Sequence, residues 1–230
     1  MNEQEITPLA HFLSTLSRGT LGENEARALL ERFGSISGMA SSSPALLMQV
    51  GHLSSAQAEL LTELPNIVRR CRMEQCGDNP RLNRLDAAAR YVRALYTGVQ
   101  REQLYMLCLD GNFRLIEASL LSSGSMIETS VSPRLVIERA LRVQTGAVIF
   151  CHNHPGGRMA FSPADVSSTA ASMKDLDRIN VAMLDHLLVA RGKIISLRRM
   201  HCIPESAWTN SGSQAVPFYQ WVKTSGDEEM

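Results

Sequence analysis

The sequence has no net charge, because its 23 basic residues are balanced by 23 acidic ones. Such a chain is not expected to bind nucleic acid or an anionic membrane through bulk charge alone. It also lacks an uncharged apolar run of about 18 residues, so we expect no transmembrane helix. The first residues contain acids but no basic segment, which argues against a secretory signal.

A regular set of cysteines is also missing. The five cysteines are odd in number and irregularly spaced, at positions 71, 76, 108, 151 and 202. We therefore expect a reduced, cytoplasmic protein rather than a disulfide framework. Hydrophobic residues make up 44% of the chain, which is enough for one or two domains with a buried core.

Residues 1–65 are expected to form an all-helical domain. Apolar residues recur at helical spacing over residues 9–33, with a turn at Ser17–Gly22. Residues 34–44 form a break of small residues, and two short helices split near Gly51–Ser54 should follow.

Residues 66–100 differ from the segment before them in being rich in arginine. Turn residues at 76–80 and an apolar stripe over 85–95 predict a helical connector here. A solvated helical face is the simplest explanation of its arginines, although contact with nucleic acid is an alternative.

Residues 101–202 mix strands with helices, which predicts an α+β domain, an α/β sandwich. Expected strands lie at 104–110, 113–121, 147–155, 181–190 and 193–199, and expected helices at 133–142 and 162–177. Residues 203–230 contain proline and many serines, and we expect a partly disordered C-terminal tail there.

A possible metal site lies where an expected strand runs into the next helix. His152 and His154 are two residues apart, so a strand would place both imidazoles on one face. Asp165 follows in the first turn of the next helix. Two imidazoles and one carboxylate leave a fourth position for water, as a catalytic zinc site requires. The alternatives are two ordinary edge histidines and a plain helix start, because Ser162–Asp165 also fits a capping box.

The spacing His-x-His, seven residues, Ser, two residues, Asp resembles the JAMM motif of the JAB/MPN metalloprotease fold. The segments HNHPGG, SPAD and LDHLLVARGKIISLR resemble the RadC family, most strongly over residues 101–200. The resemblance implies that Zn²⁺ is held by His152, His154 and Asp165. It also implies that Ser162 hydrogen-bonds the metal water or the oxyanion, and that the reaction is hydrolysis of an amide or isopeptide bond in a peptide or protein.

The same motif has an upstream glutamate that acts as the general base, and Glu102 stands at the matching position. Glu117, in the next expected strand, is the alternative. His186 also matches a family feature, and we interpret it as a residue that packs against or orients a ligand. Arg158 stands where the family often has aspartate, so we expect a positive charge near the pocket mouth that alters substrate preference.

The N-terminal helices resemble the helix-hairpin-helix region of the family, with the hairpin at residues 50–58. His52 and Ser54 stand where such hairpins usually have glycines, which let backbone amides approach a phosphate. Residues 1–65 hold three basic and seven acidic residues, a net charge of −4. We therefore predict a degenerate hairpin kept for packing or protein contacts, with weak nucleic-acid binding at most.

Two other functions remain open at this point. The chain could be a DNA-associated repair factor, as the traditional name of the family suggests, or a structural JAB/MPN module with a vestigial site. Two histidines and a carboxylate also suit non-haem iron. The complete ligand set, with a serine and a glutamate at motif positions, favours a zinc hydrolase.

Overall fold

The computed structural model describes residues 3–124 and 132–202, so the predicted tail at 203–230 lies outside the described residues. The chain divides into two compact units, Met1–Cys71 and Arg72–Met230. Within the described residues, no helix combines the length and the apolar character needed to cross a membrane.

The first unit is helical, as predicted. Its helices are α1 (Glu3–Leu16), α2 (Glu23–Phe33), α3 (Ile36–Ala40), α4 (Pro44–Gly51) and the first part of α5 (Ser55–Cys76). Helix α3 lies in the segment expected to be a break, because the Ser35 hydroxyl accepts a hydrogen bond from the Gly38 amide and starts a short helix. The core consists of apolar side chains from every one of these helices, among them Leu13, Leu29, Met39, Leu47 and Leu61.

Helices α4 and α5 form a hairpin with a three-residue connection. Helix α4 begins at Pro44, behind the Ser43 cap, and ends at Gly51. The next residue, His52, caps it in a left-handed conformation with φ of 52°. Helix α5 runs without interruption over 22 residues and includes Pro65, so position 65 lies inside a helix. The arginine-rich segment therefore begins as a continuation of this helix.

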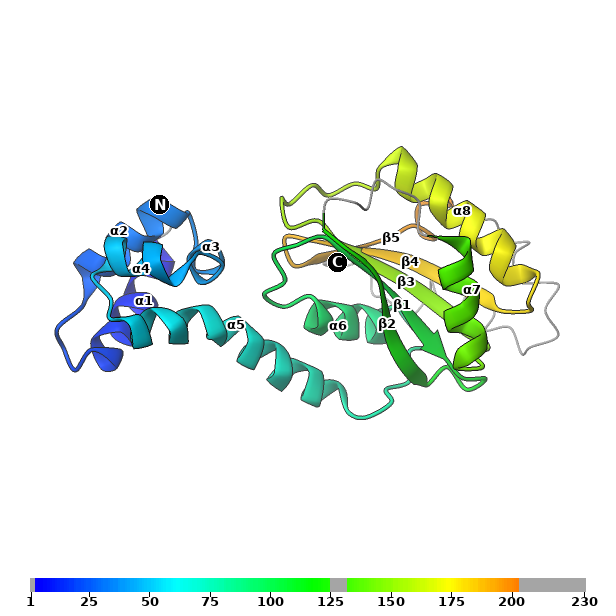
Figure 1. Ribbon diagram of the computed structural model, residues 1–230, viewed down its shortest axis with the longest axis horizontal. Coiled ribbons are helices and arrows are strands. Elements are labelled where there is room, and N and C mark those ends of the chain that lie inside the picture. Colours follow the sequence, from blue (N-terminus) through cyan, green and yellow to red (C-terminus); the bar gives the residue numbers. More distant parts are fainter. Residues whose placement is uncertain (1–2, 125–131, 203–230) are drawn as a thin grey trace. The chain divides into compact units, whose positions relative to one another are not determined.

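The second unit is built on one five-stranded sheet (Figure 1). The strands are β1 (Gln103–Leu109), β2 (Leu115–Ser123), β3 (Ala147–Asn153), β4 (Ala182–Ala190) and β5 (Lys193–Ser196), in the order β2-β1-β3-β4-β5. Strands β3 and β4 are parallel because helix α8 (Pro163–Asp177) connects them, and the other neighbours are antiparallel.

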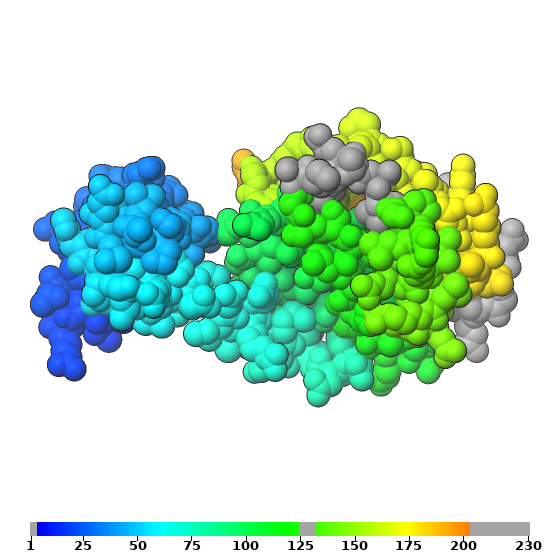
Figure 2. Space-filling view, viewed as in Figure 1, coloured from blue at the N-terminus to red at the C-terminus, as the bar shows by residue number. Residues whose placement is uncertain are grey.

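Helices cover both faces of this sheet. Helix α6 (Leu85–Leu95) packs on one face, in a cluster that includes Leu107, Ile149 and Leu187. Helices α7 (Pro133–Arg142) and α8 pack on the other face, against Met106, Val148 and Phe150. This arrangement confirms the α+β prediction. The space-filling view shows β2 and α7 at the surface of this unit (Figure 2).

Candidate metal centre

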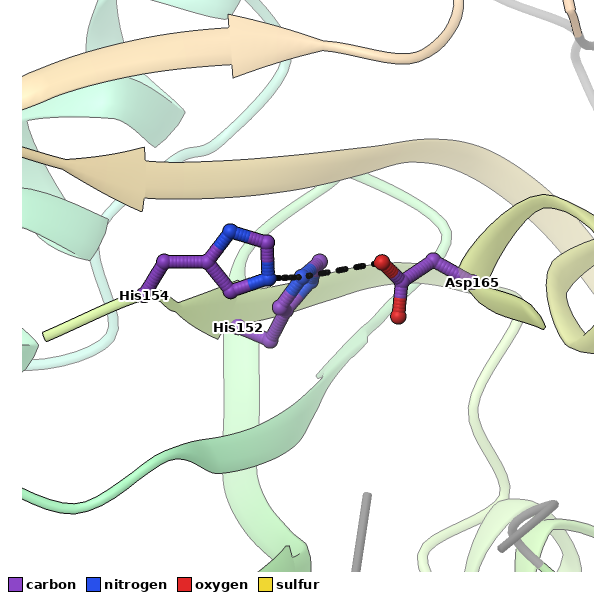
Figure 3. Close-up of side chains that lie close together, drawn as sticks. All are labelled: His152, His154 and Asp165. Atoms are coloured by element: carbon purple, nitrogen blue, oxygen red, sulfur yellow. Dashed lines mark hydrogen bonds and ion pairs between the residues drawn. The ribbon is translucent and has the colours of Figure 1, made fainter. Parts of the chain in front are cut away.

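Three potential metal ligands converge at the end of strand β3. His152 lies in β3, His154 lies just beyond it, and Asp165 lies in the first turn of α8. All three side chains are buried, and their ligand atoms lie within 4.8 Å of one another. The Nε2 atoms of the two histidines are 3.1 Å apart, and His152 Nε2 is 3.7 Å from Asp165 Oδ2. Figure 3 shows the three side chains pointing toward one another.

The proton on His154 can be placed from its hydrogen bond. Its Nδ1 atom lies 2.8 Å from the carbonyl oxygen of Arg158. A carbonyl oxygen can only accept, so Nδ1 must carry the hydrogen. In the neutral imidazole the Nε2 atom then presents its lone pair toward His152.

The proton on His152 can be placed through two further residues. The Thr169 hydroxyl donates to the Asp165 carbonyl oxygen at 2.6 Å, which uses its only hydrogen. The Nδ1 atom of His186, 2.6 Å from this hydroxyl, must therefore donate to it. In the neutral ring, His186 Nε2 then accepts from His152 Nδ1 at 2.8 Å, so His152 Nε2 is also a lone pair.

The rings of His152 and His186 are neutral near pH 7. Burial lowers the pKa of His186 well below its ordinary value, and the neighbouring His152 and His154 lower it further. Burial also lowers the pKa of His152 to about 4; Asp165 opposes this shift, and the neighbouring His154 and Arg158 add to it. A neutral imidazole is the form that binds a metal.

In these tautomers the two Nε2 atoms face each other at 3.1 Å, an arrangement that a cation bound to both would stabilise. Two atoms at about 2.0–2.1 Å from a tetrahedral zinc ion are themselves roughly 3.3–3.4 Å apart. The separations of 3.1 and 3.7 Å lie on either side of that value. The three residues therefore fit a metal ion and can hold one.

The helix start and the metal site use the same carboxylate. Asp165 Oδ2 accepts hydrogen bonds from the Ser162 amide at 2.6 Å and from the Ser162 hydroxyl at 2.8 Å, and Ser162 Oγ accepts from the Asp165 amide. This is the capping box considered as an alternative from the sequence. The two interpretations are compatible, since the cap holds Oδ2 on the side that faces His152.

The two candidate glutamates lie in different surroundings. Glu102 precedes β1, in which Leu104 pairs with His152, and it is half-buried but outside the group of three ligands. Glu117 pairs with Cys108 of β1, and Cys108 pairs in turn with Val148 of β3. Val148 is four residues from His152, a distance of about 13 Å along the strand. Both carboxylate oxygens of Glu117 accept from Arg142, at 2.6 and 2.7 Å. The backbone register therefore places Glu102, and not Glu117, at the end of β1 nearest the histidines.

Three residues of the site were not identified from the sequence. Asn153 holds the chain around Glu102 in place, because its Oδ1 accepts from the Gln103 amide at 2.9 Å and its Nδ2 donates to the Arg101 carbonyl at 3.1 Å. A polar residue at the end of an apolar strand was the available signal. Thr169 lies four residues after Asp165 on one helix face, and Phe161 packs its ring 5.4 Å from that of His152.

Two arginines lie at the loop that follows His154. Arg158 is exposed, and its charge is among those that lower the pKa of His152. Arg191, in the turn between β4 and β5, lies across Gly157, where an added Cβ would be 2.8 Å from its Nε. Gly157 has a φ of +77°, so both conformation and space favour glycine there. The two arginines therefore place positive charge beside the loop that follows His154.

A mixed sheet covered by helices on both faces, with two histidines and an aspartate that converge beyond its central strand, defines a JAB-type domain. Residues 82–202 match the family model described as RadC-like JAB domain. The chain belongs to this family.

Its relatives include UPF0758 proteins of several bacteria. The chain is 32% identical to one from Bordetella bronchiseptica over 86% of this chain and 87% of the relative. It is 35% identical to one from Leptothrix cholodnii, over 82% of this chain and 85% of the relative. It is 30% identical to one from Bordetella petrii, over 87% of this chain and 88% of the relative. The similarity is therefore longer than the JAB domain alone.

Proposed function

We propose that this protein is a zinc-dependent hydrolase that cleaves an amide or isopeptide bond in a peptide or protein. The observation that carries the proposal is the pair of buried Nε2 atoms of His152 and His154, 3.1 Å apart, with the Asp165 carboxylate 3.7 Å from His152 Nε2. Such a set occupies three coordination positions of a divalent cation and leaves a fourth for water, which is the pattern of catalytic zinc sites.

Each residue has a distinct role in this proposal. Zinc bound there supplies Lewis-acid chemistry, which lowers the pKa of a water molecule and polarises an amide carbonyl. Glu102 accepts the proton of the attacking water and returns it to the leaving amine. The Ser162 hydroxyl, which caps α8 and donates to Asp165 in the resting site, turns to donate to the oxyanion.

Metal analysis of purified variants tests the proposal. Elemental analysis at equal protein concentration should find one zinc per chain in the wild type and almost none in Asp165→Ala. Asp177→Ala, which removes an exposed carboxylate from the same helix, is the matched control and should keep its zinc. Asp165→Asn, which can still cap α8, separates loss of the ligand from loss of the helix start. Zinc retained by Asp165→Ala, or absent from the wild type, would contradict the proposal.

The hairpin of the first unit is better suited to packing or protein contacts than to DNA binding. The Ser54 amide, at the connection between α4 and α5, already donates to Gln57 Oε1 at 2.8 Å. That amide is therefore satisfied within the hairpin and is not offered to a phosphate. We propose that any nucleic-acid binding by this unit is weak.

We also propose a reduced, cytoplasmic setting. All five cysteines are free thiols. Burial raises the pKa of Cys151 and of Cys108 to about 12, so both thiols stay protonated and unreactive.

A further inference from the structure

A continuous series of hydrogen bonds joins two of the three proposed ligand residues on the side away from the metal position. It begins at the backbone carbonyl of Asp165, passes through the Thr169 hydroxyl and the His186 ring, and ends at Nδ1 of His152. Its three distances are 2.6, 2.6 and 2.8 Å. Thr169 and His186 are 2% and 3% exposed, so water does not compete for these positions.

The direction of this series is determined at one end only. The Thr169 hydroxyl donates its single hydrogen to the Asp165 carbonyl, which can only accept, and every later donor follows in order. Without that hydroxyl, His186 is free to carry its proton on Nε2 and to donate to His152 Nδ1. His152 would then carry its own hydrogen on Nε2 and point an N–H, instead of a lone pair, at the metal position.

The His186 ring has little freedom to rearrange otherwise. Its ring centroid lies 5.8 Å from that of Phe150 and 5.1 Å from that of Phe161, both in edge-to-face contact. Its backbone amide donates to Asp185 Oδ1 at 2.7 Å, and the same oxygen accepts from the Arg198 amide at 3.0 Å. A ring packed in this way is expected to respond to the loss of the Thr169 hydroxyl by moving its proton.

We propose that Thr169 and His186 are positioning residues that select the tautomer of His152 in which Nε2 is free to bind the metal. The inference builds on the proposed function, since it concerns the same metal centre. It assigns to Thr169, which contacts no metal-ligand atom in the structure, control over metal affinity from the other side of the ligand. Residues that hold a metal-binding histidine in this way typically change metal affinity by about 10–100-fold when removed.

The experiment compares Thr169→Val, which removes the hydroxyl at nearly constant volume, with Thr169→Ser, which retains it. Thr145→Val is the control, because Thr145 is also a buried threonine that bonds to backbone atoms, at the other end of β3. Zinc affinity is measured by competition with a chelator at one neutral pH. Thr169→Val should lose about 10–100-fold, while Thr169→Ser and Thr145→Val should stay close to the wild type.

A second measurement reports the tautomer directly and needs no metal. Ring ¹⁵N chemical shifts of the metal-free wild type should show hydrogen on Nδ1 of His152 and of His186. In Thr169→Val, His152 should change to the Nε2–H form or to a mixture, and His186→Phe should have the same effect by removing the acceptor.

The outcomes separate this inference from the proposed function. Hydrogen on Nε2 of His152 in the wild type would overturn the inference even if no variant folded. A folded Thr169→Val protein with unchanged affinity and unchanged His152 shifts would also overturn it. A wild type with the expected tautomers but no zinc binding would instead contradict the proposed function and leave the positioning of His152 supported.

Discussion

The two units of this chain differ most in what they bury. Among the described residues of the helical unit, the buried side chains are apolar except for Ser17. The sheet unit buries histidines, aspartates, threonines, asparagine and an arginine. Burial of a polar group is unfavourable unless hydrogen bonds compensate for it. The sheet unit therefore devotes part of its interior to a functional site, whereas any function of the helical unit must lie on its surface.

The largest expected effect is the loss of turnover on substitution of Glu102, which belongs to the sheet unit that carries the site. Glu102→Gln should leave the fold and the zinc content unchanged but lower turnover by about 10²–10⁴-fold, because the amide cannot accept a proton from water. The assay requires a peptide or isopeptide substrate found by screening. Glu117→Gln, which breaks the ion pair with Arg142, is the control and should keep its activity. The reverse result would move the general base to the neighbouring strand.

A core substitution in the helical unit should affect stability without affecting the site. Leu29 is fully buried beside Gly51, and Leu29→Ala should lower the free energy of unfolding by about 2–5 kcal/mol. Chemical denaturation measures this loss, and elemental analysis of the folded variant should still find one zinc per chain. Loss of zinc from a folded Leu29→Ala protein would show that the two interiors are coupled.

A smaller effect is expected at the two arginines beside the loop that follows His154. Arg158 and Arg191 both lie at Gly157, and Arg158→Asp should lower the preference for substrates with an acidic residue near the cleaved bond. We expect a change of roughly tenfold in relative kcat/KM, which corresponds to about 1.4 kcal/mol. Paired peptides that differ only in one glutamate or lysine provide the measurement. An unchanged ratio would show that Arg158 does not contact the substrate.

The smallest expected effect concerns nucleic acid. The full chain should bind duplex DNA no more tightly than roughly micromolar at about 0.15 M salt, since the hairpin amide is occupied and residues 1–65 carry excess acid. The double variant His52→Gly/Ser54→Gly restores the usual hairpin glycines and should still bind weakly. Tight binding by the wild type would contradict this prediction, and the arginine-rich segment 66–100 would then be the first candidate for the contact.

Much of this organisation follows from local sequence patterns. Two histidines at period two on a strand must share a face, and a Ser-Pro-x-Asp helix start must place its acid in the first turn. The N-terminal helices follow from apolar residues at helical spacing. These features depend on residues close in the chain, so the sequence alone determined the α+β character and the composition of the candidate metal site.

Other features depend on contacts between distant residues, and the tertiary structure decided them. No spacing in the sequence shows that His186 faces His152, because 34 residues and helix α8 separate them. Glu102 precedes β1 and Glu117 lies within β2, and their different surroundings are seen only in the pairing of Leu104 with His152 and of Glu117 with Arg142. The proton positions on the histidines follow from the Thr169 hydroxyl and the Arg158 carbonyl, which become their partners only when the chain is folded. Hydrogen bonds are directional and short, so they are determined by the packing of the sheet and its helices rather than by the order of the residues.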